Sequence, residues 1–165
     1  MAMKQLILIR HSKSSWETPF RDIDRPLANK GIQDALLVSS KVNEIMPKSF
    51  LVWCSIARRA KETAMIFAQN ILFPVESVVY KEDLYTFDEH KLEKIIKSCS
   101  DGVENLIVFG HNAAITNFVN KFGSTFIDNV STTGFVSITF DSDSWKNIDK
   151  GVTKKVVFPR DLKIV

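Results

Sequence analysis

A chain of 165 residues is close to the usual size of one domain, so we expect a single domain over residues 1–165. The composition, 45% apolar and 25% charged, is typical of a globular protein, and a net charge of +3 on scattered Lys and Arg disfavours a nucleic-acid partner. No apolar run approaches the roughly 18 residues of a membrane span, or the core of a signal peptide, which favours a cytoplasmic protein without a membrane partner.

The first predicted strand is the apolar run Leu-Ile-Leu-Ile at residues 6–9, a pattern typical of a strand buried on both faces. It ends directly in the charged pair Arg10 and His11. Residues 16–27 follow, with two prolines and no regular apolar period, so we expect a long connecting loop there. Long loops in compact domains are usually functional.

The rest of the chain alternates between helix and strand patterns and closes with two consecutive strands. Further strands are predicted at 50–54, 75–80, 105–109, 135–140 and 154–158. The first helix is predicted from about Asn29 to Pro47, with an apolar series that starts at Ile32. The second is predicted over 60–71, with Ser55 as its N-cap, and two more over 92–99 and 115–122. We therefore predict a three-layer α/β/α sandwich with a mostly parallel sheet and antiparallel C-terminal strands.

Three predicted junctions between a strand and the next helix carry basic side chains. Arg10 and His11 end the first strand, Arg58 and Arg59 follow the second, and His111 follows the strand 105–109. A lone histidine at a strand end is more often a surface or capping residue, and an early Arg-Arg pair is usually a solvated helix face. If the strands are parallel, however, these groups gather at one edge of the sheet, where an anion is needed to offset their charge. Arginine forks bind phosphate oxygens, and a neutral imidazole can attack phosphorus.

The junction motifs resemble those of the histidine phosphatase superfamily, which has the phosphoglycerate-mutase-like fold. The resemblance covers nearly the whole chain, and within the superfamily the chain is most similar to the short, SixA-type phosphohistidine phosphatases. The residues that carry it are Arg10-His11-Ser12, Asp24-Arg25-Pro26-Leu27, Gly31, Ser55-Ile56-Ala57-Arg58-Arg59-Ala60-Lys61-Glu62-Thr63-Ala64, Asp83-Leu84-Tyr85, Gly110-His111-Asn112 and Thr133-Gly134. The chain departs from the family pattern at Ser12, Ile56 and Ala113, none of which is a catalytic position.

The resemblance implies a nucleophile and its phosphate ligands. His11 is expected to attack phosphorus and form a phosphohistidine intermediate that water then hydrolyses. Arg10, Arg59 and His111 are expected to neutralise the phosphoryl oxygens, with Ser14 and Arg25 as further substrate-binding residues. We expect no metal and no cofactor, because these groups supply the positive charge and no cluster in the sequence has metal-ligand spacing.

The general acid that protonates the leaving group is less clearly defined by the sequence. Asp22 and Asp24 in the loop 16–27, and Asp83 after the third strand, are the candidates. The spacing Asp-x-x-Arg-Pro-Leu makes Asp22 the first choice, whereas Asp24 could simply fix the loop through a neighbouring amide or Arg25.

The predicted function is a metal-independent phosphatase acting on protein phosphohistidine, with phosphorylated proteins of the histidine phosphotransfer type as partners. An alternative is a phosphomonoesterase for small phosphorylated substrates, which would use the same residues behind different pocket walls. A phosphoprotein-binding module without turnover is the third reading. Trp16 and Phe20, which flank the predicted site, would either contact the substrate or anchor the loop on the core.

Overall fold

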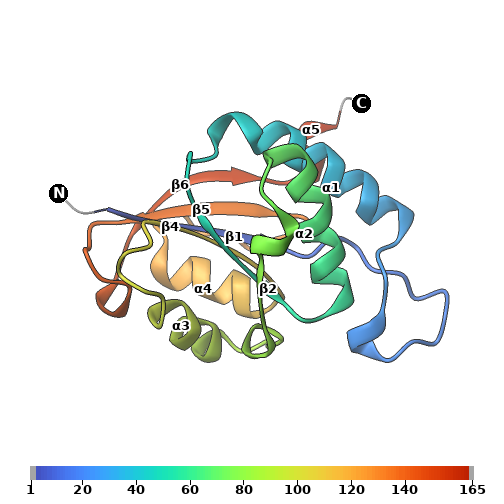
Figure 1. Ribbon diagram of the computed structural model, residues 1–165, viewed down its shortest axis with the longest axis horizontal. Coiled ribbons are helices and arrows are strands. Elements are labelled where there is room, and N and C mark those ends of the chain that lie inside the picture. Colours follow the sequence, from blue (N-terminus) through green and yellow to red (C-terminus); the bar gives the residue numbers. More distant parts are fainter. Residues whose placement is uncertain (1–2, 164–165) are drawn as a thin grey trace.

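The computed structural model describes residues 3–163, and a six-stranded sheet forms its centre (Figure 1). From one edge to the other, the strands are β3 (Val79–Lys81), β2 (Leu51–Ser55), β4 (Asn105–Gly110), β1 (Lys4–Arg10), β5 (Phe135–Phe140) and β6 (Val152–Val157). The first four run parallel, whereas β5 is antiparallel to both β1 and β6. The predicted mostly parallel sheet with antiparallel C-terminal strands is confirmed.

Two layers of helices cover the sheet, one on each face (Figure 1). The helices α1 (Asn29–Val42) and α2 (Arg58–Ile71) pack on one face, and α3 (Glu89–Lys97) and α4 (Ala114–Phe122) pack on the other. The short helix α5 (Pro159–Leu162) lies against α1. The three-layer α/β/α sandwich is therefore confirmed. Within residues 3–163, no helix has both the length and the apolar character needed to cross a membrane.

The strand β1 is buried on both faces, as its sequence predicts. Leu6 and Leu8 belong to the core under α3 and α4, and Ile7 and Ile9 to the core under α1 and α2. All four are at most 1% exposed. Burying each side chain is worth about 1.5–3 kcal/mol, so the two cores together fix the register of β1 and the place where it ends.

Two of the predicted elements are wrong in detail. Ser55 does not cap α2, because it is the last residue of β2 and the N-cap position is Ala57, whose N–H donates to Ser55 Oγ at 3.2 Å. The predicted strand 75–80 is a 3₁₀ turn at Val75–Ser77 followed by the short strand β3. The turn follows Pro74, and Glu76 and Ser77 interrupt the apolar pattern on which that prediction depended.

Helix α1 also buries a different face from the one its apolar residues suggest. Ile32 is 39% exposed, whereas Ala35, Val38 and Val42 pack into the core. Gly31 is needed for contact with the segment that follows β1, because a Cβ atom built on it would clash with the carbonyl oxygen of Lys13.

We expect Gly31→Ala to lower the free energy of unfolding by ~1–3 kcal/mol, the usual cost of overpacking. The clash is with backbone, so relief requires a shift of α1 or of the segment around Lys13, and activity should fall as well. Gly102→Ala is the matched control, because its new Cβ would meet only Ser100 Oγ at 3.8 Å. Urea unfolding of the two variants measures the difference, and equal stability would contradict the close approach.

Candidate active site

The three basic junctions meet at the carboxyl edge of the parallel strands. Arg10 lies opposite Gly110 in the register between β1 and β4, so the residues that follow the two strands are neighbours. The rings of His11 and His111 accordingly lie 5.2 Å apart between centroids. Arg59, in the first turn of α2, is only 2% exposed and faces the same edge rather than solvent. The predicted convergence of these four side chains is present.

An open cavity of about 290 Å³ lies at this edge. Its lining contains the predicted residues Arg10, His11, Ser14, Asp22, Arg25 and Arg59, together with Lys13, Trp16, Phe87 and Thr132. His111 is 2% exposed and lies beside His11 without lining the cavity. The cavity is therefore strongly cationic, with Asp22 as the one carboxylate in its described lining.

His11 is held as a neutral imidazole. Burial is the main cause that lowers its pKa to about 4, and the nearby guanidinium groups of Arg59, Arg10 and Arg25 lower it further. Its Nδ1 lies 2.7 Å from the carbonyl oxygen of Ser12, and since a carbonyl can only accept, the proton is on Nδ1. The lone pair on Nε2 is then free, which is the state that a nucleophilic histidine requires.

The buried residue Thr133, to which no role was assigned from the sequence, fixes the segment that carries His11. The Thr133 N–H lies 3.1 Å from the carbonyl oxygens of both Arg10 and His11, and its Oγ1 lies 2.7 Å from Ser12 Oγ. Thr133 has a φ of 63°, a region that β-branched residues rarely adopt and that costs energy. This conformation is held by the contacts around the nucleophile.

Thr63 connects the nucleophile segment to α2. Its Oγ1 accepts from the Ser12 N–H at 2.9 Å and donates to the carbonyl oxygen of Arg59 at 2.7 Å. One hydroxyl group thus sets the spacing between His11 and Arg59. Thr63 and Thr133 both lie within the motifs of the sequence, which is the signal that marks them, but their bonding depends on tertiary contacts.

His111 is neutral rather than cationic in the ligand-free protein. Burial is again the main cause that lowers its pKa, to about 3, and the neighbouring His11 and Arg59 add to it. Its Nε2 lies 2.8 Å from Ser55 Oγ, while Nδ1 is buried and has no hydrogen-bond partner among the described residues. The expected positive charge at His111 is thus absent, and the ring instead offers a hydrogen-bonding group.

The carboxylate of Asp22 joins two of the arginines. Arg59 Nη2 donates to Asp22 Oδ2 at 3.0 Å, and Arg59 Nη1 donates to the Asp22 main-chain oxygen at 2.7 Å. Arg25 Nη2 donates to Asp22 Oδ1 at 3.1 Å, and its Nη1 donates to Ser14 Oγ. The guanidinium of Arg25 also stacks on the Trp16 ring, 3.6 Å from its centroid. Trp16 is 77% exposed, so it does not anchor the loop on the core.

Of the three candidate acids, Asp22 is the one that lines the cavity. Partial burial alone would raise the pKa of Asp22, but hydrogen bonds from Tyr85, Arg25 and Arg59 outweigh it and hold the pKa well below the usual range. The carboxylate is therefore ionised and carries no proton to donate in this state. Asp24 instead pairs with Arg21 at 2.8 Å. The Tyr85 hydroxyl, which donates to Asp22 Oδ2, is a site group that the sequence did not assign.

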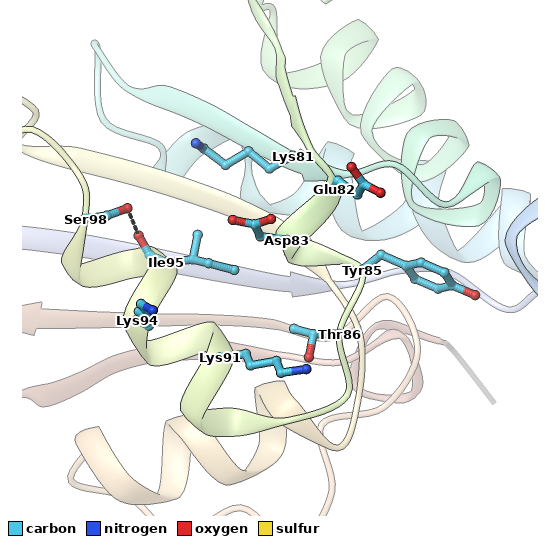
Figure 2. A pocket seen from close by; sticks show the side chains of 9 residues that line it. All are labelled: Lys81, Glu82, Asp83, Tyr85, Thr86, Lys91, Lys94, Ile95 and Ser98. Carbon is cyan, nitrogen blue, oxygen red and sulfur yellow. Dashed lines mark hydrogen bonds between the residues drawn. The ribbon is translucent and has the colours of Figure 1, made fainter.

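Asp83 lines a different cavity, shown in Figure 2, which is larger at about 460 Å³. Its walls come from the segment after β3 and from α3, and they include the basic side chains Lys91 and Lys94. Figure 2 shows Asp83 pointing into this cavity, while the Tyr85 ring extends away from it. The described lining contains no histidine and no arginine, so the phosphate chemistry belongs to the smaller cavity. Among residues 3–163, no three His, Cys, Asp or Glu side chains are grouped as metal ligands.

Solved structures share this fold over almost their full length. The SixA protein from Nakamurella multipartitia aligns with a TM-score of 0.83 at 18% identity, covering 96% of this chain and 98% of its own. The protein histidine phosphatase SixA complexed with tungstate aligns with a TM-score of 0.81 at 20% identity, covering 96% and 99%. The fold is thus the phosphoglycerate-mutase-like fold of the histidine phosphatases, with histidines and arginines at the carboxyl edge of its sheet.

Comparison of sequences assigns the family. Residues 6–88 match the histidine phosphatase superfamily (branch 1), and the chain belongs to that superfamily. A protein of Mycobacterium leprae is 35% identical over 112 residues, which cover 66% of each chain. The 2,3-bisphosphoglycerate-dependent phosphoglycerate mutase of Gloeothece citriformis is 31% identical over 97 residues, 56% of this chain and 42% of the mutase. This chain thus spans just under two thirds of the Mycobacterium leprae protein and less than half of the mutase.

The neutral histidines predict a loss of stability in mild acid. In the unfolded chain, His11 and His111 are protonated near their ordinary pKa of 6.5. In the folded protein, the pKa is lowered to about 4 for His11 and to about 3 for His111. The free energy of unfolding should therefore fall as the pH drops below about 6.5, by about 3 kcal/mol at pH 4 for His11 alone.

Urea unfolding at pH 7.5, 6 and 5 measures this dependence. The variant His111→Asn should give a flatter profile between these values, because one of the two groups is removed. His90→Asn is the control, since His90 is exposed at the start of α3 and its replacement should leave the profile unchanged. If the free energy of unfolding fell equally with pH in the native protein and in His111→Asn, this would contradict a buried, neutral His111.

Proposed function

We propose that the protein is a phosphatase that uses His11 as its nucleophile and acts on phosphohistidine in another protein. The observation that carries this proposal is a neutral, buried imidazole with a free Nε2, set beside the guanidinium groups of Arg10 and Arg59. Such a site offers an attacking nitrogen together with positive charge for the oxygens of a phosphoryl group. Membership of the histidine phosphatase superfamily supports the same chemistry.

The reaction proceeds in two displacements. The Nε2 lone pair of His11 attacks phosphorus, a P–N bond forms, and the bond to the leaving group breaks with its electron pair going to the leaving group. Water then attacks the phosphohistidine, the bond from phosphorus to Nε2 breaks, and inorganic phosphate leaves with His11 neutral again. Arg10 and Arg59 bind the phosphoryl oxygens, where charge is concentrated in the transition state.

Three further residues complete the phosphoryl-binding site in this proposal. Arg25 supplies another guanidinium, held in place by Ser14 and by stacking on Trp16. His111 supplies a hydrogen-bonding group, since its buried Nδ1 has no partner among the described residues. Ser14 lines the cavity and can also contact the substrate. The required charge comes from these side chains, and the proposal includes no metal or cofactor.

The state of Asp22 favours a phosphoramidate over a phosphate ester. Asp22 is ionised, so the general-acid role predicted for it lacks a proton at the start of the reaction. An alkoxide leaving group needs such a proton, whereas the nitrogen of a phosphorylated imidazole is basic and takes its proton from solvent with little help. The open cavity is also accessible to a side chain on a partner protein. The partner proposed is accordingly a phosphorylated protein of the histidine phosphotransfer type; the structural relative complexed with tungstate is named a protein histidine phosphatase.

Comparing two substrates tests this proposal. We expect kcat/KM for a phosphohistidine protein to exceed that for a small alkyl phosphate by about 100-fold or more, the contribution that a general acid normally makes. p-Nitrophenyl phosphate, whose leaving group needs no protonation, is the control for an intact site. Faster turnover of the alkyl ester would instead establish the small-molecule phosphomonoesterase. A phosphoryl group trapped on His11, and absent from His11→Ala, separates an enzyme from a binding module.

The two adjacent arginines of α2 should differ sharply in their effect on turnover. Arg59→Ala should lower kcat by about 100-fold or more, because it removes a buried charge from the phosphoryl site. Arg58→Ala should change kcat by no more than about threefold, since Arg58 is half-exposed and pairs with Glu62 at 3.0 Å. Steady-state kinetics of both variants measures the ratio, and equal losses would show that Arg59 is not the phosphate ligand.

A further inference from the structure

Asp22 occupies the position of a ligand in the ligand-free site. Three of its oxygen contacts go to the two arginines: Oδ2 and the main-chain oxygen accept from Arg59, at 3.0 and 2.7 Å, and Oδ1 accepts from Arg25, at 3.1 Å. One residue thus presents three oxygen atoms to two guanidinium groups. That is the arrangement expected of the three terminal oxygens of a phosphoryl group.

We propose that Asp22 is a specificity-determining residue: it acts as an internal anion that any ligand of Arg25 and Arg59 must displace. This inference rests on the proposed function, in which both arginines bind the phosphoryl group. The ligand-free protein is then a mixture in which only the fraction with Asp22 withdrawn binds the substrate, and the measured affinity is reduced by that fraction.

The arginines and the aspartate differ in how firmly they are held. The side chains of Arg59 and Arg25 are 3% and 7% exposed, whereas that of Asp22 is 46% exposed. Asp22 begins a 3₁₀ turn, Asp22–Asp24, within the long loop, and among the described residues its hydrogen bonds to a helix go to Arg59 alone. The guanidinium groups are therefore the fixed part of the site, and Asp22 is the part that can move outward. The Tyr85 hydroxyl donates to Oδ2 and holds the carboxylate inward.

A phosphoryl group can displace Asp22 more effectively than a carboxylate ligand can. A dianionic phosphoryl group carries twice the charge of Asp22 and offers three terminal oxygens in place of the three acceptors that leave. It also brings acceptors to a site where the buried Nε atoms of Arg10, Arg25 and Arg59 have no partner among the described residues. A carboxylate has two oxygens and the same charge as Asp22, so it gains nothing by the exchange. Asp22 thus biases the site toward phosphoryl groups.

Asp24 provides a matched control for the loss of one negative charge. It lies on the same turn, its side chain is also 46% exposed, and it pairs with Arg21 rather than with an arginine of the site. If Asp22 acted only through its long-range charge, replacing either aspartate would strengthen anion binding to a similar extent. If Asp22 occupies the binding position, replacing Asp24 has little effect.

Calorimetric titration with inorganic phosphate, at one pH and one ionic strength, tests the inference without requiring turnover. Asp22→Asn should bind phosphate roughly fivefold more tightly, or better, because the negative charge that competes for the two arginines is removed. Acetate, a probe with one carboxylate and a single negative charge, should bind measurably to Asp22→Asn and not to the native protein. Asp24→Asn should match the native protein for both probes. Thermal unfolding of each variant shows whether it is folded.

A second variant leaves the charge in place. Tyr85→Phe removes the hydroxyl that holds Asp22 inward, and a smaller gain in phosphate affinity is expected. Unchanged or weaker phosphate binding by folded Asp22→Asn would overturn the inference and leave the phosphatase proposal intact. If this variant also hydrolysed substrate more slowly while its phosphate affinity stayed unchanged, Asp22 would instead be assigned the general-acid role. If no variant binds phosphate and His11 cannot be phosphorylated, the proposed function itself fails.

Discussion

The crowding of positive charge at one desolvated sheet edge governs the rest of the site. Arg10, Arg25 and Arg59 lie around His11, and arginine does not release its proton at any ordinary pH. Burial is the main cause that keeps both histidines neutral, and the neighbouring cations add to it, while hydrogen bonds from Tyr85, Arg25 and Arg59 keep Asp22 ionised. The neutral state of His11, the cationic lining and the ionised Asp22 thus depend on one arrangement of buried charges, which the two packed faces of β1 hold in place.

Much of the architecture could be predicted from the sequence because hydrophobic periodicity reports burial directly. The run at 6–9 alternates between the two cores, and the strand patterns at 105–109 and 135–140 fall within β4 and β5. Parallel topology then brings together residues that are far apart in the chain, as with His11 and His111. The errors have equally physical causes: Ser55 continues β2 instead of capping α2, and the residues after Pro74 form a 3₁₀ turn, Val75–Ser77, before the short strand β3.

Two properties of the site could not be predicted from the sequence: the hydrogen bonds between side chains, and the protonation states. Both depend on neighbours that only the tertiary structure brings together. Thr63, Thr133 and Tyr85 stand in matched motifs, yet nothing in the sequence tells which donors and acceptors they meet. The charge of His111 follows from its burial beside other cations, a property of the assembled site. Sequence patterns thus identified the chemical groups, and the structure defined their charge and their partners.

The position of Trp16 allows its fluorescence to be used to study the site. Two of the three tryptophans, Trp53 and Trp145, are buried at 6% and 0% exposure, whereas Trp16 is 77% exposed and lies against the guanidinium of Arg25. A nearby cation and contact with water both alter indole emission, so the fluorescence of this one side chain is sensitive to the occupancy of the anion pocket. The protein therefore carries an intrinsic reporter at the mouth of its own binding site, with the other two indoles as an internal reference.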